Sequence, residues 1–318
     1  MTLMRMNILS VLSLALLLTA CGKEKQFHEQ VTAPLSLEMS YGDCAFSDQF
    51  ESITTGKIRY IIRTFPVGAI YGETEPVQEF VIFRDLRHGF DHTAILDMYI
   101  GSYDVMVWSD LIEEGESDSC YNVDDFGEIA REYGYTGNNE YRIAFRGVAA
   151  VDVKQKDVPV SVKVKMESPM ARFELVSDDL QQFVASQTDL VSGAVAVEDY
   201  TAVVVYSGYV PDVYSLYADK PVDSATGVRF LSPMTRVNDT EVSLGLDYVF
   251  VGEKSSSVTV KVGVYDTQGQ LVSVSAPVKL TLQRGECNVK TSNFLTSSPS
   301  LDGIYIDTDF EGSFDIEL

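Results

Sequence analysis

The sequence predicts an all-β protein made of two tandem antiparallel β-sandwich domains with a minor helical part. Short segments of alternating apolar and polar residues recur at roughly ten-residue spacing with turn residues between them, as in β-sandwiches. Strand patterns do not alternate with helix patterns, so a parallel sheet built of βαβ units is not favoured. The chain of 318 residues is too long for one typical hydrophobic core. We therefore expect two domains, at residues 32–158 and 159–318.

The first 20 residues have the features of a secretory signal peptide. Arg5 gives a positive charge, residues 8–18 are apolar, and Thr19 and Ala20 are the small residues that a signal peptidase requires. The apolar run is too short for a membrane span, which needs about 20 residues. Cys21 follows directly, as in the bacterial lipobox, which this pattern resembles. That resemblance implies a membrane anchor of diacylglycerol and palmitate-type chains on Cys21.

The residues after Cys21 indicate the side of the membrane that the protein faces. Lys23 and Glu24 resemble the charged signal with which Bacteroidetes export lipoproteins to the cell surface. Residues 21–31 are mostly polar, and we expect them to form a flexible tether. The expected location is therefore the outer membrane, with the folded part exposed at the cell surface.

Period-two alternation dominates the first expected domain. A strand is expected from Leu35 to Tyr41, and Pro66 closes a second, β-rich run. The acidic residues 113–125 predict an exposed loop, and residues 126–133 a short helix. The remaining strands are expected at residues 77–83, 95–100, 103–108, 141–145 and 158–166.

The second expected domain contains one helix signal among further strands. Ser177 can cap a helix whose apolar stripe is Leu180, Phe183 and Val184. Residues 266–269 read as a hairpin connection in which Gly269 can adopt positive φ. Strands are expected at residues 201–206, 228–231, 242–250, 258–265, 271–274 and 278–282, and the alternation of Phe314, Ile316 and Leu318 with acidic residues predicts a terminal strand.

The composition excludes some classes of function. The net charge of −23 argues against nucleic acid as a partner, because nucleic-acid binding needs clustered Lys and Arg. It also disfavours electrostatic adhesion to an anionic bilayer, so the lipid would provide the membrane attachment. An acidic surface keeps an extracellular protein soluble.

Three cysteines remain besides Cys21. Cys44 and Cys120 both fall in the first expected domain and could form a disulfide in an oxidising compartment, with Cys287 left as a buried, Val-like residue. No CxxC pair is present, so redox and zinc functions have little support.

No pattern of catalytic or ligand-binding residues stands out. His88 and His92 have the spacing of metal ligands on a helix, but Gly89 between them favours a solvated turn. Nucleophile elbows and phosphate-binding glycine loops are missing from the sequence. We therefore expect a protein that is not an enzyme and that uses no cofactor and no metal.

Three stretches together resemble a known family. Residues 101–108 contain a Gly-x-Tyr-x-x-x-x-Trp strand made by Gly101, Tyr103 and Trp108. Residues 168–173 resemble the opening of a second domain, and residues 282–285, 293–296 and 310–312 a C-terminal end. The chain thereby resembles the fimbrillin-like surface lipoproteins of Bacteroidales. The resemblance implies two transthyretin-like β-sandwiches and a place in, or at the base of, a surface fimbria.

The resemblance also bears on the role within a fimbria. Polymerising fimbrillins are cut after an Arg beyond the lipid, and the groove so opened accepts a strand of the next subunit by β-strand addition. The first arginines after Cys21 are Arg59 and Arg63, both inside an expected strand. A trypsin-like protease has no evident site before them unless it accepts Lys23, Lys25 or Lys57. The chain therefore resembles a retained FimB-type anchor subunit, with fimbrial subunits as partners. Phe314, Ile316 and Leu318 are either a donor strand or an ordinary edge strand.

Two further interpretations stay open. Residues 223–225 resemble the short O-glycosylation tripeptide of exported Bacteroidetes proteins, with Ser224 as the modified residue. A glycan-binding surface lipoprotein of a polysaccharide-uptake system is the alternative function, because residues 206–217 are rich in Tyr and exposed aromatic rings stack on sugars. Burial of Trp108 would remove one candidate for such stacking.

Overall fold

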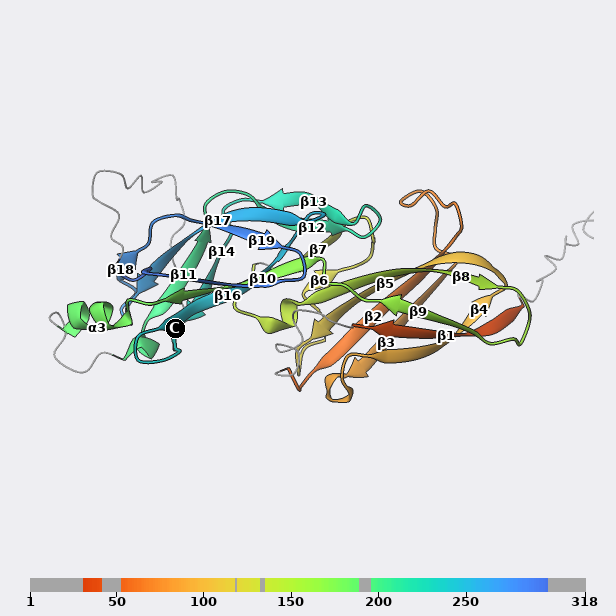
Figure 1. Ribbon diagram of the computed structural model, residues 1–318, viewed down its shortest axis with the longest axis horizontal. Helices are drawn as coiled ribbons and strands as arrows, with labels where there is room; N and C mark the ends of the chain where they lie inside the picture. Colours follow the sequence, from red (N-terminus) through yellow and green to blue (C-terminus); the bar gives the residue numbers. More distant parts are fainter. Residues whose placement is uncertain (1–30, 42–52, 118, 132–134, 189–195, 297–318) are drawn as a thin grey trace, which may run out of the picture.

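The computed structural model describes residues 31–41, 53–117, 119–131, 135–188 and 196–296. Two β-sandwiches lie along the long axis of the molecule (Figure 1). This architecture confirms the predicted all-β fold. Within the described residues, no helix is long and apolar enough to cross a membrane.

The N-terminal sandwich consists of two sheets. The first has the order β4-β1-β9, and the second has the order β3-β2-β5-β8. Their bounds are β1 Thr32–Ser40, β2 Lys57–Pro66, β3 Gln78–Asp85, β4 His92–Tyr99, β5 Gly101–Ile112, β8 Ala144–Val153 and β9 Val160–Lys165. The predicted alternation in β1 is confirmed, because Leu35, Leu37 and Met39 point into the core and are fully buried.

The C-terminal sandwich also has two sheets, with orders β15-β16-β10-β20 and β14-β11-β17-β18, and β19 pairs with β17 as well. The bounds are β10 Met170–Ser177, β11 Thr201–Tyr206, β14 Arg229–Pro233, β15 Thr235–Arg236, β16 Val242–Phe250, β17 Ser255–Tyr265, β18 Leu271–Val274, β19 Val278–Gln283 and β20 Cys287–Ser292. The predicted helix is α3, Leu180–Thr188, which buries Leu180 and Phe183. The predicted hairpin connection is also confirmed, with Gly269 at φ 72°.

The two sandwiches repeat one arrangement of seven strands. In each, the first strand lies between an antiparallel and a parallel neighbour: β1 between β4 and β9, and β10 between β16 and β20. In each, the second strand lies at the centre of the other sheet, so β3-β2-β5-β8 corresponds to β14-β11-β17-β19. The corresponding strands also follow the same order along the chain. The protein therefore contains the same topology twice.

A further sheet joins the two halves. It has the order β13-β12-β7-β6, with β6 Tyr121–Asn122 and β7 Ile129–Arg131 from the N-terminal half and β12 Val210–Ser215 and β13 Lys220–Ala225 from the C-terminal half. Its strands lie between the two sandwiches in Figure 1. This joining sheet arises from insertions into the two seven-strand units, because β6 and β7 follow β5, whereas β12 and β13 follow β11.

Several details differ from the sequence-based expectations. The short helix expected at residues 126–133 is wrong, because Ile129–Arg131 form β7, which pairs with β6 and β12. The strand expected at residues 141–145 begins at Ala144, after the 3-10 turn Glu140–Arg142. Strand β9, which lies close to the expected boundary between the domains, pairs with β1 of the N-terminal sandwich. Local periodicity does not record such long-range pairing.

Candidate functional site

Buried aromatic side chains and ion pairs gather at the junction of the two sandwiches, where the joining sheet covers the outer face of β2 and β5. Trp108 on β5 is fully buried and donates its indole N–H to Asp110. Its ring meets Tyr121 edge to face at 5.7 Å between centroids, and Tyr214 at 6.2 Å. Tyr121 belongs to the N-terminal half and Tyr214 to the C-terminal half. The joining sheet thus gives the N-terminal sandwich a third layer.

A buried ion pair lies at the centre of this junction. Arg142 of the N-terminal half donates to Asp247 on β16 and to the Tyr248 carbonyl oxygen. Tyr135 and Tyr206 also donate to Asp247, the latter at 2.6 Å. Burial would lower the pKa of Arg142, but the Asp247 carboxylate together with Tyr135 and Tyr121 outweighs it, so that pKa is raised. Burial and Asp247 raise the pKa of Tyr135 to about 12.

Two further charged clusters connect the halves. Arg172 on β10 donates to Glu140 at 2.8 Å, and the Tyr248 hydroxyl donates to the same carboxylate. On the other side of the junction, Asp219 accepts from Arg146 on β8 and from Arg284, the latter at 2.7 Å. Each cluster joins side chains that are far apart in the sequence. Together with the buried Arg142–Asp247 pair, these contacts hold the sandwiches in one arrangement.

A cavity of about 220 Å³ opens beside the junction. It is lined by Arg131 and Arg142 together with Glu113, Glu116 and Cys120. Burial raises the pKa of the Cys120 thiol. The two guanidinium groups already bind Asp212 and Asp247, so the lining carries charges that are largely balanced. This balance provides no strong preference for an anionic or a cationic ligand.

Other candidate ligand residues remain dispersed. In the part of the chain that the structure describes, no three His, Cys, Asp or Glu residues gather as a metal site would require. His88 ends a 3-10 turn and His92 begins β4, with Gly89 between them at φ 75°. The two histidines therefore do not lie on one helix face.

The family of the protein follows from a match over most of its length. A family model described as a family of unknown function (DUF6562) matches residues 23–318. The chain belongs to this family. A search of the curated proteins finds no significant match.

Solved structures from Bacteroidales are similar at low identity. The fimbrial anchor protein Mfa2 from Porphyromonas gingivalis has 12% identity and a TM-score of 0.40, covering 76% of this chain and 82% of that one. A fimbrial assembly protein from Parabacteroides distasonis has 10% identity and a TM-score of 0.42, covering 82% and 91%. A protein provisionally described as polysaccharide-binding, from Bacteroides thetaiotaomicron, has 10% identity and a TM-score of 0.44, covering 76% and 79%.

Most of the site residues expected from the sequence lie outside the described part of the chain. This holds for the lipidation site Cys21, the export signal Lys23 and Glu24, the disulfide partner Cys44 and the terminal Phe314, Ile316 and Leu318. The signal peptide and nearly all of the tether lie outside it as well. These expectations stay predictions.

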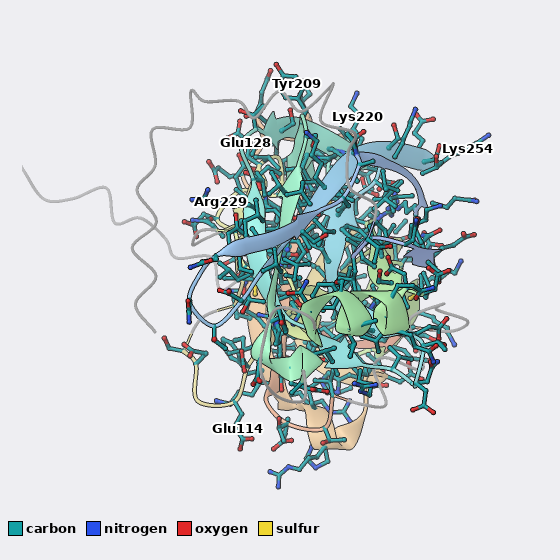
Figure 2. The ribbon with its side chains drawn as sticks, turned by 90° about the vertical axis from the view of Figure 1, so that its left-hand side faces the viewer. Glu114, Glu128, Tyr209, Lys220, Arg229 and Lys254 are labelled. Carbon is teal, nitrogen blue, oxygen red and sulfur yellow. The ribbon has the colours of Figure 1, made fainter. Side chains whose placement is uncertain are left out.

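The structure describes two of the expected site residues, and it also describes the Tyr-rich segment. Cys120 is half-buried beside the junction, and Ser224 is exposed on β13, where it pairs with Pro211. Within the Tyr-rich segment, Tyr206 and Tyr214 are buried, whereas Tyr209 projects into solvent (Figure 2). Trp108 is buried and is therefore not available for stacking on a sugar.

Sequence reasoning missed the residues of the junction, although a signal was present. Asp110 and Asp247 are single acidic residues within apolar strand segments. A charge at such a position is buried on folding and then requires a partner. The sequence did not show which arginine would be that partner, because Arg142 follows a stretch without clear periodicity.

Proposed function

We propose that the protein is a surface lipoprotein of the outer membrane that acts as a non-polymerising anchor or accessory subunit of a fimbria in cell adhesion, of the FimB type. The lipid on Cys21 would hold it in the membrane, and the two sandwiches would bind fimbrial subunits. One observation carries the proposal: the first arginines after Cys21 lie in a central strand and are held there by ion pairs.

The first of these arginines is part of a dense network of contacts. Arg59 on β2 donates through Nε and Nη2 to the two carboxylate oxygens of Asp110, at 2.9 and 2.6 Å. It also donates to Ser119 and to the Tyr121 carbonyl oxygen. Strand β2 pairs along its length with β3 on one side and β5 on the other. A protease that needs an extended substrate would have to unfold the sandwich to reach this bond.

The second arginine is equally constrained. Arg63 binds Glu79 at 2.6 Å, donates to the Val123 carbonyl oxygen, and lies with its guanidinium 4.4 Å from the centre of the Phe126 ring. Polymerising fimbrillins, by the resemblance, need a cut at an accessible Arg near the N-terminus. In this chain the first arginines after Cys21 lie in a folded strand, where cleavage would not take place. The chain would therefore keep Cys21, which an anchor requires.

The first strand supports the same conclusion. Strand β1 lies between β4 and β9, so its removal would split one sheet of the N-terminal sandwich. Its inward side chains Leu35, Leu37 and Met39 are fully buried, and their exposure would cost several kcal/mol at about 25 cal/mol per Å² of apolar surface. Loss of this strand would therefore be a much larger disruption than the release of a loosely bound segment.

Fimbrial subunits would be bound by β-strand addition at an exposed edge. Among the described strands, β3 pairs with β2 alone and exposes Val81 and Phe83 on alternate positions. An added strand could form main-chain hydrogen bonds along this edge. The proposed function involves no catalysis, no cofactor and no nucleic acid, and Ser224 on the exposed β13 is proposed as an O-glycosylation site.

Co-purification with fimbriae tests the proposal. Cells that express the wild-type protein should retain fimbriae, and the protein should fractionate with the outer membrane and be accessible to an added protease. The variant Cys21→Ala should lose the membrane attachment and release the fimbriae. Cys287→Ala serves as a matched control, since it replaces another cysteine and should keep both. Fimbriae that stay attached in Cys21→Ala cells would contradict the proposed role.

The alternative proposal is a glycan-binding surface lipoprotein of a polysaccharide-uptake system. Tyr209 is the exposed aromatic residue of the Tyr-rich segment that could contact a sugar. Binding on a glycan array that Tyr209→Ala abolishes, together with no fimbriae in the pull-down, would favour this alternative over the anchor.

A further inference from the structure

The outer face of one C-terminal sheet is apolar at its centre. In β11 and β17, Ala202, Val204, Val262 and Val264 point into the core, so the residues between them point outward. Val203 pairs with Gly263 on one side and with Leu231 of β14 on the other. Leu231 is 58% exposed, and Leu271 on the neighbouring β18 is 50% exposed.

Gly263 shapes the middle of this outer face. A methyl group at this position would lie 3.3 Å from Leu271 Cδ1 and from the Tyr265 ring. The two side chains therefore approach each other above the glycine. Together, Val203, Leu231, Gly263, Tyr265 and Leu271 form a continuous apolar strip across four strands, which we call the outer strip. Leu231 and Leu271 are its most exposed members, whereas Val203 is 7% exposed. Contiguous exposed apolar groups can mark a binding surface.

Positive charges lie beside the outer strip. Val205 pairs with Arg229 on β14 and with Lys261 on β17, so both cations point to the same face as the strip. Lys279 on β19 pairs with Thr259 and lies farther along the same face. Figure 2 shows Arg229 at the surface of this sandwich. A segment that fits the outer strip would thus combine apolar side chains with acidic ones.

In the N-terminal sandwich, the joining sheet covers the corresponding face. Its row of paired residues is Val81, Ile61 and Trp108 on β3, β2 and β5. Ile61 and Trp108 are buried beneath the joining sheet, whereas Val81 at the edge stays exposed. The seven-strand unit is the same in both sandwiches. Among the described residues, a third layer covers this face in the N-terminal unit but not in the C-terminal unit.

The described chain ends at the β18 edge of the sheet that carries this face. Ser273 on β18 donates to the Leu295 carbonyl oxygen at 2.5 Å, and the Thr296 amide donates to Asp179 at 2.7 Å. Strand β18 is also the strand that carries Leu271 of the outer strip. Both β18 and α3 lie at the end of the molecule that is remote from the N-terminal sandwich (Figure 1). Ser273 pairs with the inward-pointing Val264, and Leu295 is 3% exposed, so this contact lies on the inner side of the sheet. The residues that follow Thr296 would pass around the β18 edge to reach the outer strip.

Residues 297–318 have the composition that this face requires. They include six acidic residues and no Lys or Arg, and their apolar residues are Leu301, Ile304, Tyr305, Ile306, Phe310, Phe314, Ile316 and Leu318. In 304–306 and 314–318 the residues can present an apolar side to a sheet. A segment of this length can extend about 70 Å, whereas a five-strand sheet is only about 20–25 Å wide.

We propose that residues 297–318 fold back over the outer strip of the same chain and form its third layer, with their carboxylates near Arg229, Lys261 and Lys279. This inference does not depend on the proposed fimbrial function. It differs from donation of the terminal strand to another subunit, because the occupant of the face is the chain's own C-terminal segment.

Hydrogen–deuterium exchange of the full chain, measured by mass spectrometry, tests this inference. In the wild-type monomer, the amides of residues 301–318 should exchange at least about tenfold more slowly than those of a synthetic peptide of the same sequence. The double variant Leu231→Asp and Leu271→Asp should lose this protection, and Lys261→Glu should reduce it. Val289→Asp is the matched control, because Val289 is 62% exposed on the other sheet, and it should keep the protection.

The amides of β2 and β5 serve as an internal reference that each variant is folded. Exchange of residues 301–318 at the peptide's rate in the wild-type monomer would overturn the proposal. Protection that the double variant leaves unchanged would do so too, because the segment would then pack elsewhere. Protection that increases with protein concentration would place the segment on a second copy of the chain and would equally overturn it.

Discussion

The two sandwiches share one strand topology but differ in what covers the outer face of the sheet that contains their second strand. In the N-terminal unit this face carries Trp108, which is 0% exposed under the joining sheet. In the C-terminal unit it carries Gly263 between Leu271 and Tyr265. The insertions after β5 and β11 both contribute to the N-terminal third layer. A repeated fold can thus provide an internal joint in one copy and, among the described residues, a face without a third layer in the other.

The chemistry of the two faces differs accordingly. The covered face carries buried charges with partners, such as Arg59 with Asp110. The uncovered face carries cations beside an apolar strip and no acidic residue on the paired positions described above. Buried charges make the relative position of two layers specific, whereas exposed cations and apolar groups can bind an additional segment. The following predictions test this contrast, from the largest expected effect to the smallest.

The largest effect is expected from the ion pair between the halves. Asp247→Asn would leave Arg142 buried with a neutral partner and should lower the free energy of unfolding by about 3–5 kcal/mol. Urea denaturation measures this change. Glu38→Gln removes one partner of the exposed pair with Lys163 and should have almost no effect. Equal losses in the two variants would mean that the junction does not depend on this buried pair.

The third layer itself is tested by two aromatic residues on one face. Trp108→Ala should destabilise the protein by about 3–5 kcal/mol, because it opens a cavity beneath the joining sheet. Phe83→Ala removes a side chain that is 55% exposed on the same sheet face and should change the stability by about 0.5–1 kcal/mol. Thermal or urea unfolding compares them. Similar losses of stability in the two variants would mean that the joining sheet protects Trp108 no more than Phe83, contrary to what the contacts of Trp108 indicate.

A disulfide between Cys44 and Cys120 would attach another segment to the junction. Mass spectrometry of unreduced peptides should detect the linked pair, and Cys120→Ser should then cost about 2–4 kcal/mol of stability. Cys287→Ser is the control and should leave the link intact. If both Cys44 and Cys120 react with an alkylating agent before reduction, the pairing is wrong.

The smallest effect concerns pH in the N-terminal unit. Burial and the nearby Arg84 lower the pKa of His92, so the folded state binds fewer protons than the unfolded state, whose pKa is about 6.5. Stability should therefore fall as the pH drops from 7.5 to 5.5. The melting temperature of His92→Gln should decline less over this range than that of the wild type. Parallel declines would exclude a contribution of His92.

The sequence was most informative where a residue's environment depends on its nearest neighbours. Alternation identified β1, and Gly269 marked a hairpin connection. The apolar stripe of Leu180 and Phe183 identified α3, but the predicted cap is wrong, because Ser177 ends β10 and its hydroxyl accepts from the Phe294 and Leu295 amides. It was least informative for the junction, since β7 and β12 belong to different halves and are short. Arg142 and Asp247 are 105 residues apart, and no local pattern links them. Pairing over such distances is decided by tertiary packing, which also overrides the helix pattern at residues 126–133.

The most direct test of the anchor role is the N-terminus of the mature protein. Protein isolated from the cell surface should begin at Cys21 and carry the mass of its lipid, because Arg59 and Arg63 are held in β2. Intact-mass and N-terminal peptide analysis measure both features at once. A mature protein that lacks the acylated Cys21 and begins near residue 50 would contradict the account.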